Sequence, residues 1–314
     1  MVKMWSKLIS FFMSVVMFFM GLFGLGDGRT DKPADGGVNI VFEQELRYAD
    51  GERNVFDFAF PETANSEIGL VLAIHGGAWV SGSKENETNV IKACAQKGYA
   101  AAAINYSYIS ESVHCDTLIK EIGLALQAIQ EHAAGKGLKI TGVILRGESA
   151  GAHLAMLYAY TKAAETKKQT GMEIKAVFDY CGPTSLDKVD MVGDLLLTSF
   201  GTEGIAAILS DLCGVTVNVN NCSDRDVKAA LAAVSPACFA SSAVPTVICH
   251  GMADVLVPYL NAVMLDAELT KAGIEHTLIS FPTSGHLLEN DADKMEQANR
   301  LFNEYCAACL AAAK

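Results

Sequence analysis

The chain has 314 residues, 51% of them hydrophobic, and carries 24 basic against 36 acidic side chains. That length suffices for one large domain or two small ones. A charged fraction of 19%, with 27 Gly and 7 Pro, argues against a disordered or low-complexity chain. The net charge of −12 makes nucleic acid a poor partner, because a phosphate-binding surface needs clustered cations. The sequence shows no 20–50-residue repeat and no sustained heptad, which excludes solenoid and coiled-coil architectures.

An apolar stretch at residues 8–25 is the first feature along the chain. As a helix it would be about 27 Å long, close to the ~30 Å hydrocarbon core of a bilayer. Lys3 and Lys7 precede it, so the positive-inside rule keeps the N-terminus cytoplasmic and sends the rest of the chain outward. We expect an uncleaved signal-anchor that tethers the protein to the membrane. A cleaved signal peptide, which would give a secreted protein, is the alternative.

A polar segment follows the apolar stretch. Residues 27–37 are rich in Gly and Asp and include Pro33, a composition that predicts a linker. The sequence therefore divides into a targeting segment at 1–26, a linker at 27–37 and one domain at 38–314.

Nine cysteines are present, and an odd number leaves at least one thiol free. Cys213 and Cys222 lie in one loop-rich region and could pair. Cys306 and Cys309 are three residues apart on a predicted helix. Without a second Cys or His pair at ligand spacing, we expect them to be small buried hydrophobic residues and not zinc ligands. No metal and no cofactor is expected.

The domain begins with a hairpin signal, because strand-like residues 38–48 and 54–60 are joined through Asp50-Gly51. Short apolar runs then alternate with helical stretches, which predicts an α/β fold with a mostly parallel, doubly wound sheet covered on both faces. Three helices are expected to end at the glycine caps Gly98, Gly135 and Gly273. The expected buried strands are 70–75, 100–106, 143–147, 177–180, 246–250 and 277–281, and the expected helices are 88–97, 117–134, 150–164, 258–272 and 291–313.

One long segment interrupts this alternation. About 65 residues separate the sixth strand from the seventh, too many for a simple crossover. Short helices are predicted at 195–200, 205–212 and 227–233, with glycines between them. Long ordered insertions in compact domains are often lids. We therefore expect a helical cap insertion after the sixth strand, at about 186–234.

A nucleophile motif follows the fifth predicted strand, in Gly147-Glu148-Ser149-Ala150-Gly151. Gly-x-Ser-x-Gly alone is weak evidence, but here it stands on the strand–turn–helix junction that a nucleophile elbow requires. The tight turn leaves no room for Cβ atoms beside the serine. Ser149 is therefore predicted to project into a cleft, with the amide of Ala150 facing an oxyanion. The alternative is an ordinary glycine-rich turn between a strand and a helix, with no catalytic role.

A second glycine motif, His75-Gly76-Gly77-Ala78-Trp79, follows the third predicted strand. Consecutive glycines let the backbone bend so that several peptide N–H groups point at one spot, which is what stabilising an oxyanion needs. The predicted oxyanion hole consists of Gly76, Gly77, Ala78 and Ala150.

A hydroxyl nucleophile needs a base, and the base needs an orienting carboxylate. Asp254 follows the seventh predicted strand and His286 follows the eighth, so the chain order is Ser, Asp, His. We predict Ser149, Asp254 and His286 as the catalytic residues. The other candidates are expected to be structural: His75 and His250 at strand ends, His153 packed one turn into a helix, and Asp291 and Asp293 as first-turn helix acids.

These motifs together carry a family resemblance. From about residue 38 to its end, the chain resembles α/β-hydrolase esterases with an HGGxW motif, akin to hormone-sensitive-lipase-like carboxylesterases and bacterial feruloyl or acetyl-xylan esterases. Ala78 departs from the pattern, because lipase relatives have a third glycine there. The positions that match are His75–Trp79, Gly147–Leu154, Ser235-Pro236 ahead of Pro245, Asp254 with Val257-Pro258, and Gly285-His286.

The resemblance implies an α/β-hydrolase fold and hydrolysis of a small-molecule carboxylic ester through an acyl-enzyme. It does not name the ester, because the cap has no pattern that matches. Three alternatives stay open. One is a formamidase or peptidase on the same scaffold, since amide and ester hydrolysis share an intermediate. Another is a non-catalytic binding module of this fold. The third is a membrane-surface lipase, suggested by the predicted anchor, although the apolar stretch is better explained as the tether.

Overall fold

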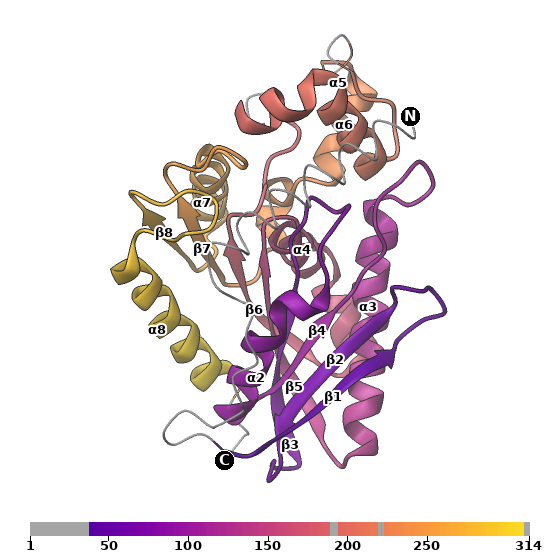
Figure 1. Cartoon of the computed structure of the whole chain (residues 1–314), viewed down its shortest axis with the longest axis vertical. Coiled ribbons are helices and arrows are strands. Elements are labelled where there is room, and N and C mark those ends of the chain that lie inside the picture. The colour runs from indigo at the N-terminus through magenta and orange to yellow at the C-terminus, as the bar shows by residue number, and fades with distance from the viewer. Residues whose placement is uncertain (1–37, 189–193, 219–220, 222, 311–314) are drawn as a thin grey trace.

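An eight-stranded sheet forms the centre of the molecule, in the order β1-β2-β4-β3-β5-β6-β7-β8 (Figure 1). The computed structural model describes residues 38–188, 194–218, 221 and 223–310. The strands β3 to β8 run parallel, while β1 and β2 form an antiparallel hairpin and β2 pairs antiparallel with β4. The predicted mostly parallel sheet is thus confirmed. Its strands are β1 Ile40–Arg47, β2 Val55–Pro61, β3 Glu67–Ile74, β4 Ala100–Ile104, β5 Lys139–Glu148, β6 Glu173–Tyr180, β7 Thr246–Gly251 and β8 His276–Phe281.

Helices cover both faces of the sheet and form two separate hydrophobic cores. Along β3, Leu70, Leu72 and Ile74 pack into one core, while Val71 and Ala73 pack into the other. This alternation follows from the two-residue period of a strand and explains why the strand is apolar throughout. The first face carries α3 Cys115–Gly135, α4 Ala150–Thr170 and α7 Leu260–Ala272, and the second carries α2 Thr88–Gln96 and α8 Ala292–Cys309.

The carboxyl ends of the parallel strands meet at one edge of the sheet. β3 and β5 are neighbours in the sheet, with Ile74 paired to Gly147. After β3 the chain continues to β4 on one side of this pair, and after β5 it continues to β6 on the other side. Such a reversal of strand order is where open α/β sheets bind ligands. The loop after β3 and the turn after β5 are the two segments that carry the predicted oxyanion hole and nucleophile, and both lie at this point.

Two helices occupy the region expected to form a cap, α5 Asp194–Cys213 and α6 Arg225–Ala233. They lie together beyond the sheet, on the side away from α8 (Figure 1). The prediction of separate helices at 195–200 and 205–212 is wrong, because α5 continues through Gly201 and Gly204. A glycine costs a helix about 1 kcal/mol but keeps its backbone N–H, so it weakens the hydrogen-bond ladder without ending it.

Two of the three expected glycine caps are confirmed. Gly98 and Gly273 have positive φ after α2 and α7, as expected of glycine caps. Gly135, in contrast, is the last residue of α3, and the left-handed position after that helix is taken by Gly137.

The eight described cysteines are free thiols, and Cys222 lies outside the described residues. The predicted anchor at 8–25 also lies outside them, and within the described part of the chain no helix is long and apolar enough to cross a bilayer.

A buried ion pair anchors the segment that leaves the loop after β3. Lys84 opens the short 3-10 helix η1 Lys84–Glu87 and has no exposed surface. Its ammonium contacts the fully buried carboxylate of Asp57 on β2 at 3.0 Å, and also Glu45 and Glu85. Burial alone would lower the pKa of Lys84, but these carboxylates raise it above its ordinary value, so the amine stays charged.

Replacing Lys84 with methionine leaves the Asp57 carboxylate buried without its cation. We expect Lys84→Met to lower the free energy of unfolding by about 3–5 kcal/mol, measured by urea denaturation. Lys139→Met is the control, because the Lys139–Glu67 pair is largely exposed and removing it should cost at most about 1 kcal/mol. Equal losses in the two variants would contradict the proposed anchor.

Candidate active site

Ser149 stands on the turn between β5 and α4 in a strained backbone conformation. Its φ is +53° and its ψ is −118°, a region that residues other than glycine rarely adopt. The backbone N–H donates to the carbonyl oxygen of Tyr180 at 2.8 Å, which fixes the turn against β6. The side chain sits at the N-cap position of α4 but makes no capping hydrogen bond, so its hydroxyl is not committed to the helix. Strain of this kind is typical of functional turns.

The two glycines of the motif are required by close backbone contacts. A Cβ atom on Gly147 would lie 2.4 Å from the carbonyl carbon of Gly151. A Cβ atom on Gly151 would lie 2.0 Å from the carbonyl oxygen of Ile74, the last residue of β3. The first turn of α4 can therefore rest on the end of β3 only because neither position has a side chain.

The loop after β3 is bent by three successive residues with positive φ: Gly77 at +116°, Ala78 at +49° and Trp79 at +62°. The carbonyl of Gly77 accepts hydrogen bonds from the N–H groups of Val80 and Ser81. Among the described residues, no acceptor is paired with the backbone N–H of Gly77 or Ala78, nor with that of Ala150 at the start of α4. Unpaired N–H donors on such a loop and at a helix N-terminus are suited to an anionic oxygen.

Gly76 joins this loop to the turn that carries Ser149. A Cβ atom there would lie 2.9 Å from the carbonyl oxygen of Glu148 and 3.4 Å from Cβ of Ser149. The backbone at Gly76 therefore lies directly against the turn that carries Ser149. The predicted oxyanion-hole residues and the predicted nucleophile are thus brought together.

Arg53 supports the far side of the loop. Its Nε donates to the carbonyl of Tyr106 at 2.8 Å and its Nη2 donates to the carbonyl of Gly82 at 3.0 Å. Its guanidinium also lies 3.8 Å above the ring of Tyr108. These contacts tie the end of the glycine loop to the segment after β4. Nothing near Arg53 in the chain resembles a motif, so its role could not be predicted from the sequence.

His75 is a structural residue, as expected. Its Nδ1 donates to the carbonyl of Gly76 at 2.7 Å, its ring stacks on Tyr106 at 4.2 Å, and Nε2 lies 3.4 Å from Arg53. Burial lowers the pKa of His75 to about 4, so the ring is neutral near pH 7. These contacts of His75 help to hold the loop after β3 in its bent conformation.

His153 connects three parts of the site. The indole Nε1 of Trp79 donates to Nδ1 of His153 at 3.2 Å, and Nε2 of the same imidazole donates to the carbonyl of Val234 at 2.7 Å. Burial lowers its pKa to about 4, which keeps Nδ1 available as an acceptor. The loop after β3, helix α4 and the segment after α6 are therefore joined through one neutral ring.

Asp254 and His286 are in direct contact, although 32 positions separate them in the chain. Nδ1 of His286 donates to Oδ2 of Asp254 at 2.7 Å. The other carboxylate oxygen accepts from the N–H groups of Leu256 at 2.8 Å and Val257 at 2.9 Å. The Asp254 side chain is fully buried, while that of His286 keeps 15% of its surface exposed. The imidazole is thus oriented through Nδ1 and its side chain stays partly exposed.

A second histidine reaches the same carboxylate. Nε2 of His250 lies 3.3 Å from Oδ2 of Asp254 and 2.8 Å from the carbonyl of Val257. Burial alone would raise the pKa of Asp254, but the hydrogen bonds from His250 and His286 bring it well below its ordinary value. Burial also works against protonation of His250, yet Asp254 and Asp179 raise its pKa. Asp254 is therefore ionised at neutral pH, with donors on both oxygens.

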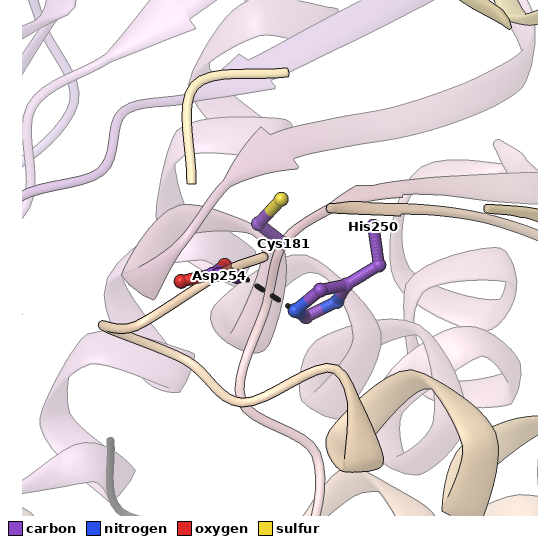
Figure 2. A group of neighbouring side chains, drawn as sticks. All are labelled: Cys181, His250 and Asp254. Atoms are coloured by element: carbon purple, nitrogen blue, oxygen red, sulfur yellow. Dashed lines mark ion pairs between the residues drawn. The ribbon is translucent and has the colours of Figure 1, made fainter. Parts of the chain in front are cut away.

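One group of described residues has the composition of a metal site: Cys181, His250 and Asp254, whose ligand atoms lie within 4.8 Å of one another (Figure 2). All three are buried, and the figure shows the ion pair between His250 and Asp254. Burial and the neighbouring Asp254 raise the pKa of the Cys181 thiol, which disfavours the thiolate that a metal would need. The hydrogen bonds to Asp254 already account for this arrangement.

Asp291 holds the loop that carries His286. Asp291 was predicted to be a first-turn helix acid, but this is not its main role. It occupies the N-cap of α8 and makes no capping hydrogen bond there. Its carboxylate accepts instead from the N–H and hydroxyl of Thr283 and from the hydroxyl of Ser284, at 2.6–3.3 Å. Only the folded loop reveals this role.

The structure thus joins Asp254 to His286 and joins the glycine loop to Ser149. No hydrogen bond joins the Ser149 hydroxyl to His286 in the described part of the chain. Ser149, Asp254 and His286 follow β5, β7 and β8 at the same edge of one sheet. Catalytic hydrogen bonds are often long without substrate and tighten in the substrate complex.

Fold and site together define an α/β hydrolase. A family model described as BD-FAE matches residues 56–269, more than half of the chain, and the chain belongs to that family. The crystal structure of Esterase B from Lactobacillus rhamnosis is 19% identical with a TM-score of 0.74, and the match covers 97% of this chain and 95% of that one. The resemblance to α/β-hydrolase esterases is thereby confirmed.

The curated relatives match this chain over a smaller share of their own length. Kynurenine formamidase of Salmo salar is 30% identical over 115 residues, which are 36% of this chain and 37% of that protein. A probable isoprenylcysteine alpha-carbonyl methylesterase of Oryza sativa subsp. japonica is 23% identical over 254 residues, 76% of this chain and 56% of that protein. The chain therefore matches less than two thirds of the length of either relative.

The neutral state of His153 gives a pH-dependent prediction. The folded pKa lies below the unfolded value of about 6.5, so the stability that the ring contributes is present above that pH and is lost as the pH falls toward 4. Glutamine does not titrate. We expect His153→Gln to cost about 1–3 kcal/mol of unfolding free energy at pH 7.5 and roughly 2 kcal/mol less at pH 5.

The measurement is urea denaturation of both proteins at the two pH values. Comparing the two proteins at each pH removes the contributions of other titrating groups, including Asp179 and Glu87, whose pKa values are raised by burial. A cost that stays the same at both pH values would contradict a buried neutral His153.

Proposed function

We propose that the protein is a serine hydrolase of carboxylic esters that works through an acyl-enzyme. The observation that carries the proposal is the 2.7 Å hydrogen bond between Asp254 and His286, on the same sheet edge as the strained Ser149. Acyl transfer requires an oriented imidazole, a nucleophile on a tight turn and unpaired amides, and these features support the proposal. The esterases and methylesterase among the similar proteins support the same class of reaction.

In the first half of the reaction, Oγ of Ser149 attacks the ester carbonyl carbon while Nε2 of His286 takes the hydroxyl proton. Asp254 accepts from Nδ1 of His286, which keeps Nε2 unprotonated beforehand and stabilises the imidazolium afterwards. The carbonyl oxygen becomes an oxyanion, and the N–H groups of Gly77, Ala78 and Ala150 donate to it, with Gly76 holding the loop in place.

In the second half, the bond from the carbonyl carbon to the alcohol oxygen breaks and His286 gives its proton to that oxygen. The acyl group now esterifies Ser149. Water then attacks the acyl carbon, His286 accepts its proton, and the same amides hold the second oxyanion. Release of the carboxylic acid returns the proton to Oγ of Ser149, so that the cycle balances.

A formamidase is the second candidate. Kynurenine formamidase of Salmo salar supports it at 30% identity, although over little more than a third of either chain. Hydrolysis of an N-formyl group would use the same nucleophile, base and amides, with an amine in place of the alcohol as leaving group. The two candidates therefore differ in substrate and share a mechanism.

We also propose that residues 8–25 tether the chain to a membrane with the domain at 38–314 on the outer side, and that 27–37 serve as the linker. The apolar length of residues 8–25 and the preceding Lys3 and Lys7 support this. The intact mass of the native protein distinguishes a retained segment from a cleaved one.

Ser149→Ala is expected to reduce kcat for p-nitrophenyl acetate by roughly 10⁴–10⁶, because the nucleophile is lost while the fold is kept. A fluorophosphonate probe should label the native protein and not the variant. Ser112→Ala, at an exposed loop serine, is the matched control and should retain activity and labelling. Substantial turnover by Ser149→Ala would refute the assignment, and an inactive, unlabelled native protein would favour a non-catalytic binding module.

Specificity constants for N-formylkynurenine and for short acyl esters separate the two candidates. We expect kcat/KM to be higher for the esters, and both activities to disappear together in Ser149→Ala, because the two reactions share one intermediate. A higher kcat/KM for the formamide would make formamidase the main activity.

A further inference from the structure

Exposed apolar side chains are concentrated beside the Asp254–His286 pair. In the described part of the chain, large hydrophobic residues with more than a third of their surface exposed occur at seven positions. Two of them, Val38 and Val215, lie elsewhere. The other five lie on the loops of Asp254 and His286 or on the start of α7: Met252 at 52%, Val255 at 54%, Leu260 at 45%, Val263 at 39% and Leu287 at 43%.

The two loops form one unit. The N–H of Met252 donates to the carbonyl of Phe281 at 2.9 Å and the N–H of Ala253 donates to the carbonyl of Ser284 at 3.1 Å. The Asp254–His286 hydrogen bond joins them again. Val255 directly follows Asp254 and Leu287 directly follows His286. The exposed side chains are therefore carried by the same backbone that positions the acid and the base.

Single exposed apolar residues are common and need no explanation, but a group of them gathered at one place marks a binding surface. The helices α5 and α6 lie apart from α7 and β8 (Figure 1). We call Met252, Val255 and Leu287, with Leu260 at the start of α7, the apolar rim.

The chemistry of the site indicates which part of a substrate meets the rim. In the proposed reaction His286 must protonate the oxygen of the leaving alcohol, so that oxygen has to lie within hydrogen-bond reach of the imidazole. The alcohol group therefore extends past His286 and its loop, whereas the acyl carbonyl oxygen points at the amides of Gly77, Ala78 and Ala150. The rim stands on the alcohol side of the site.

We propose that the apolar rim binds the alcohol portion of the ester, and that the preferred substrates are esters of apolar alcohols with several carbons. This rests on the proposed ester hydrolysis. Contact with the rim removes alkyl or aryl surface from water, and each buried methylene of the alcohol should add to transition-state binding.

The experiment compares two ester series by titrating the acid released. One series holds acetate fixed and lengthens the alcohol from methyl to hexyl. The other holds methanol fixed and lengthens the acyl group from acetyl to hexanoyl. In the native protein, kcat/KM should rise about two- to fourfold per methylene along the alcohol series. In the variant Met252→Ser, Val255→Ser, Leu287→Ser, kcat/KM should no longer rise with alcohol length, while its dependence on acyl length should match that of the native protein.

The matched control is Val38→Ser, Val215→Ser, which removes exposed apolar side chains away from the site and should retain the native rise. An unchanged alcohol series in the rim variant overturns the proposal, and so does a loss confined to the acyl series. The proposal is also overturned if the rim variant keeps the native dependence of kcat/KM on alcohol length and shows a different defect. Such a defect would be a loss of binding to phosphatidylcholine vesicles, or a change from dimer to monomer in sedimentation. Native protein that hydrolyses no ester, methyl acetate included, contradicts the proposed function itself.

Discussion

The site depends on one close contact between backbones, where the first turn of α4 rests on the end of β3. A Cβ atom on Gly151 would lie 2.0 Å from the carbonyl oxygen of Ile74, so glycine is required there by space alone. The contact sets the height of Ser149 above the sheet and brings the Gly76 backbone against the same turn. The positive φ of Ser149 costs about 1–3 kcal/mol and persists because β5, β6 and α4 leave the turn no alternative.

A second constraint concerns the charge on Asp254. A buried carboxylate is costly unless donors surround it, and here two backbone N–H groups and two imidazoles do so. The donors come from the loop itself and from β7 and the loop after β8. Ionisation of Asp254 and correct folding of both loops therefore depend on each other. Asp291 adds to this by fixing the loop of His286 from the start of α8.

Much of this could be predicted from the sequence, for a physical reason. Strands buried on both faces are short continuous apolar runs, so β3, β4, β7 and β8 were located within a few residues of their bounds. The start of β5 was missed by four residues, because Thr141 and Gly142 interrupt its apolar run. The nucleophile and oxyanion motifs are local, since each lies within one turn of chain. Asp254 and His286 were suggested by their places after successive strands.

The residues that escaped prediction act through contacts that only the folded chain brings together. Arg53 supports carbonyls of Gly82 and Tyr106, and Asp291 supports Thr283 and Ser284. Such contacts depend on which chain segments meet in the fold, and neither composition nor periodicity records that. The continuous helix α5 escaped for another reason: glycine lowers helix propensity without forbidding the conformation, so Gly201 and Gly204 suggested a break that packing overrides.

The histidines show how the fold assigns different tasks to one residue type. Burial is the dominant influence on His75 and His153 and makes both rings neutral, and their contacts hold the glycine loop in shape. His250 has carboxylates on two sides but no exposed surface, so it can support Asp254 without exchanging protons with a substrate. His286 alone combines contact with Asp254 and an exposed edge. A base that must take a proton from a hydroxyl and return it to a leaving group needs both properties, so the environment of each ring, and not its position in a motif, determines which histidine can serve as the base.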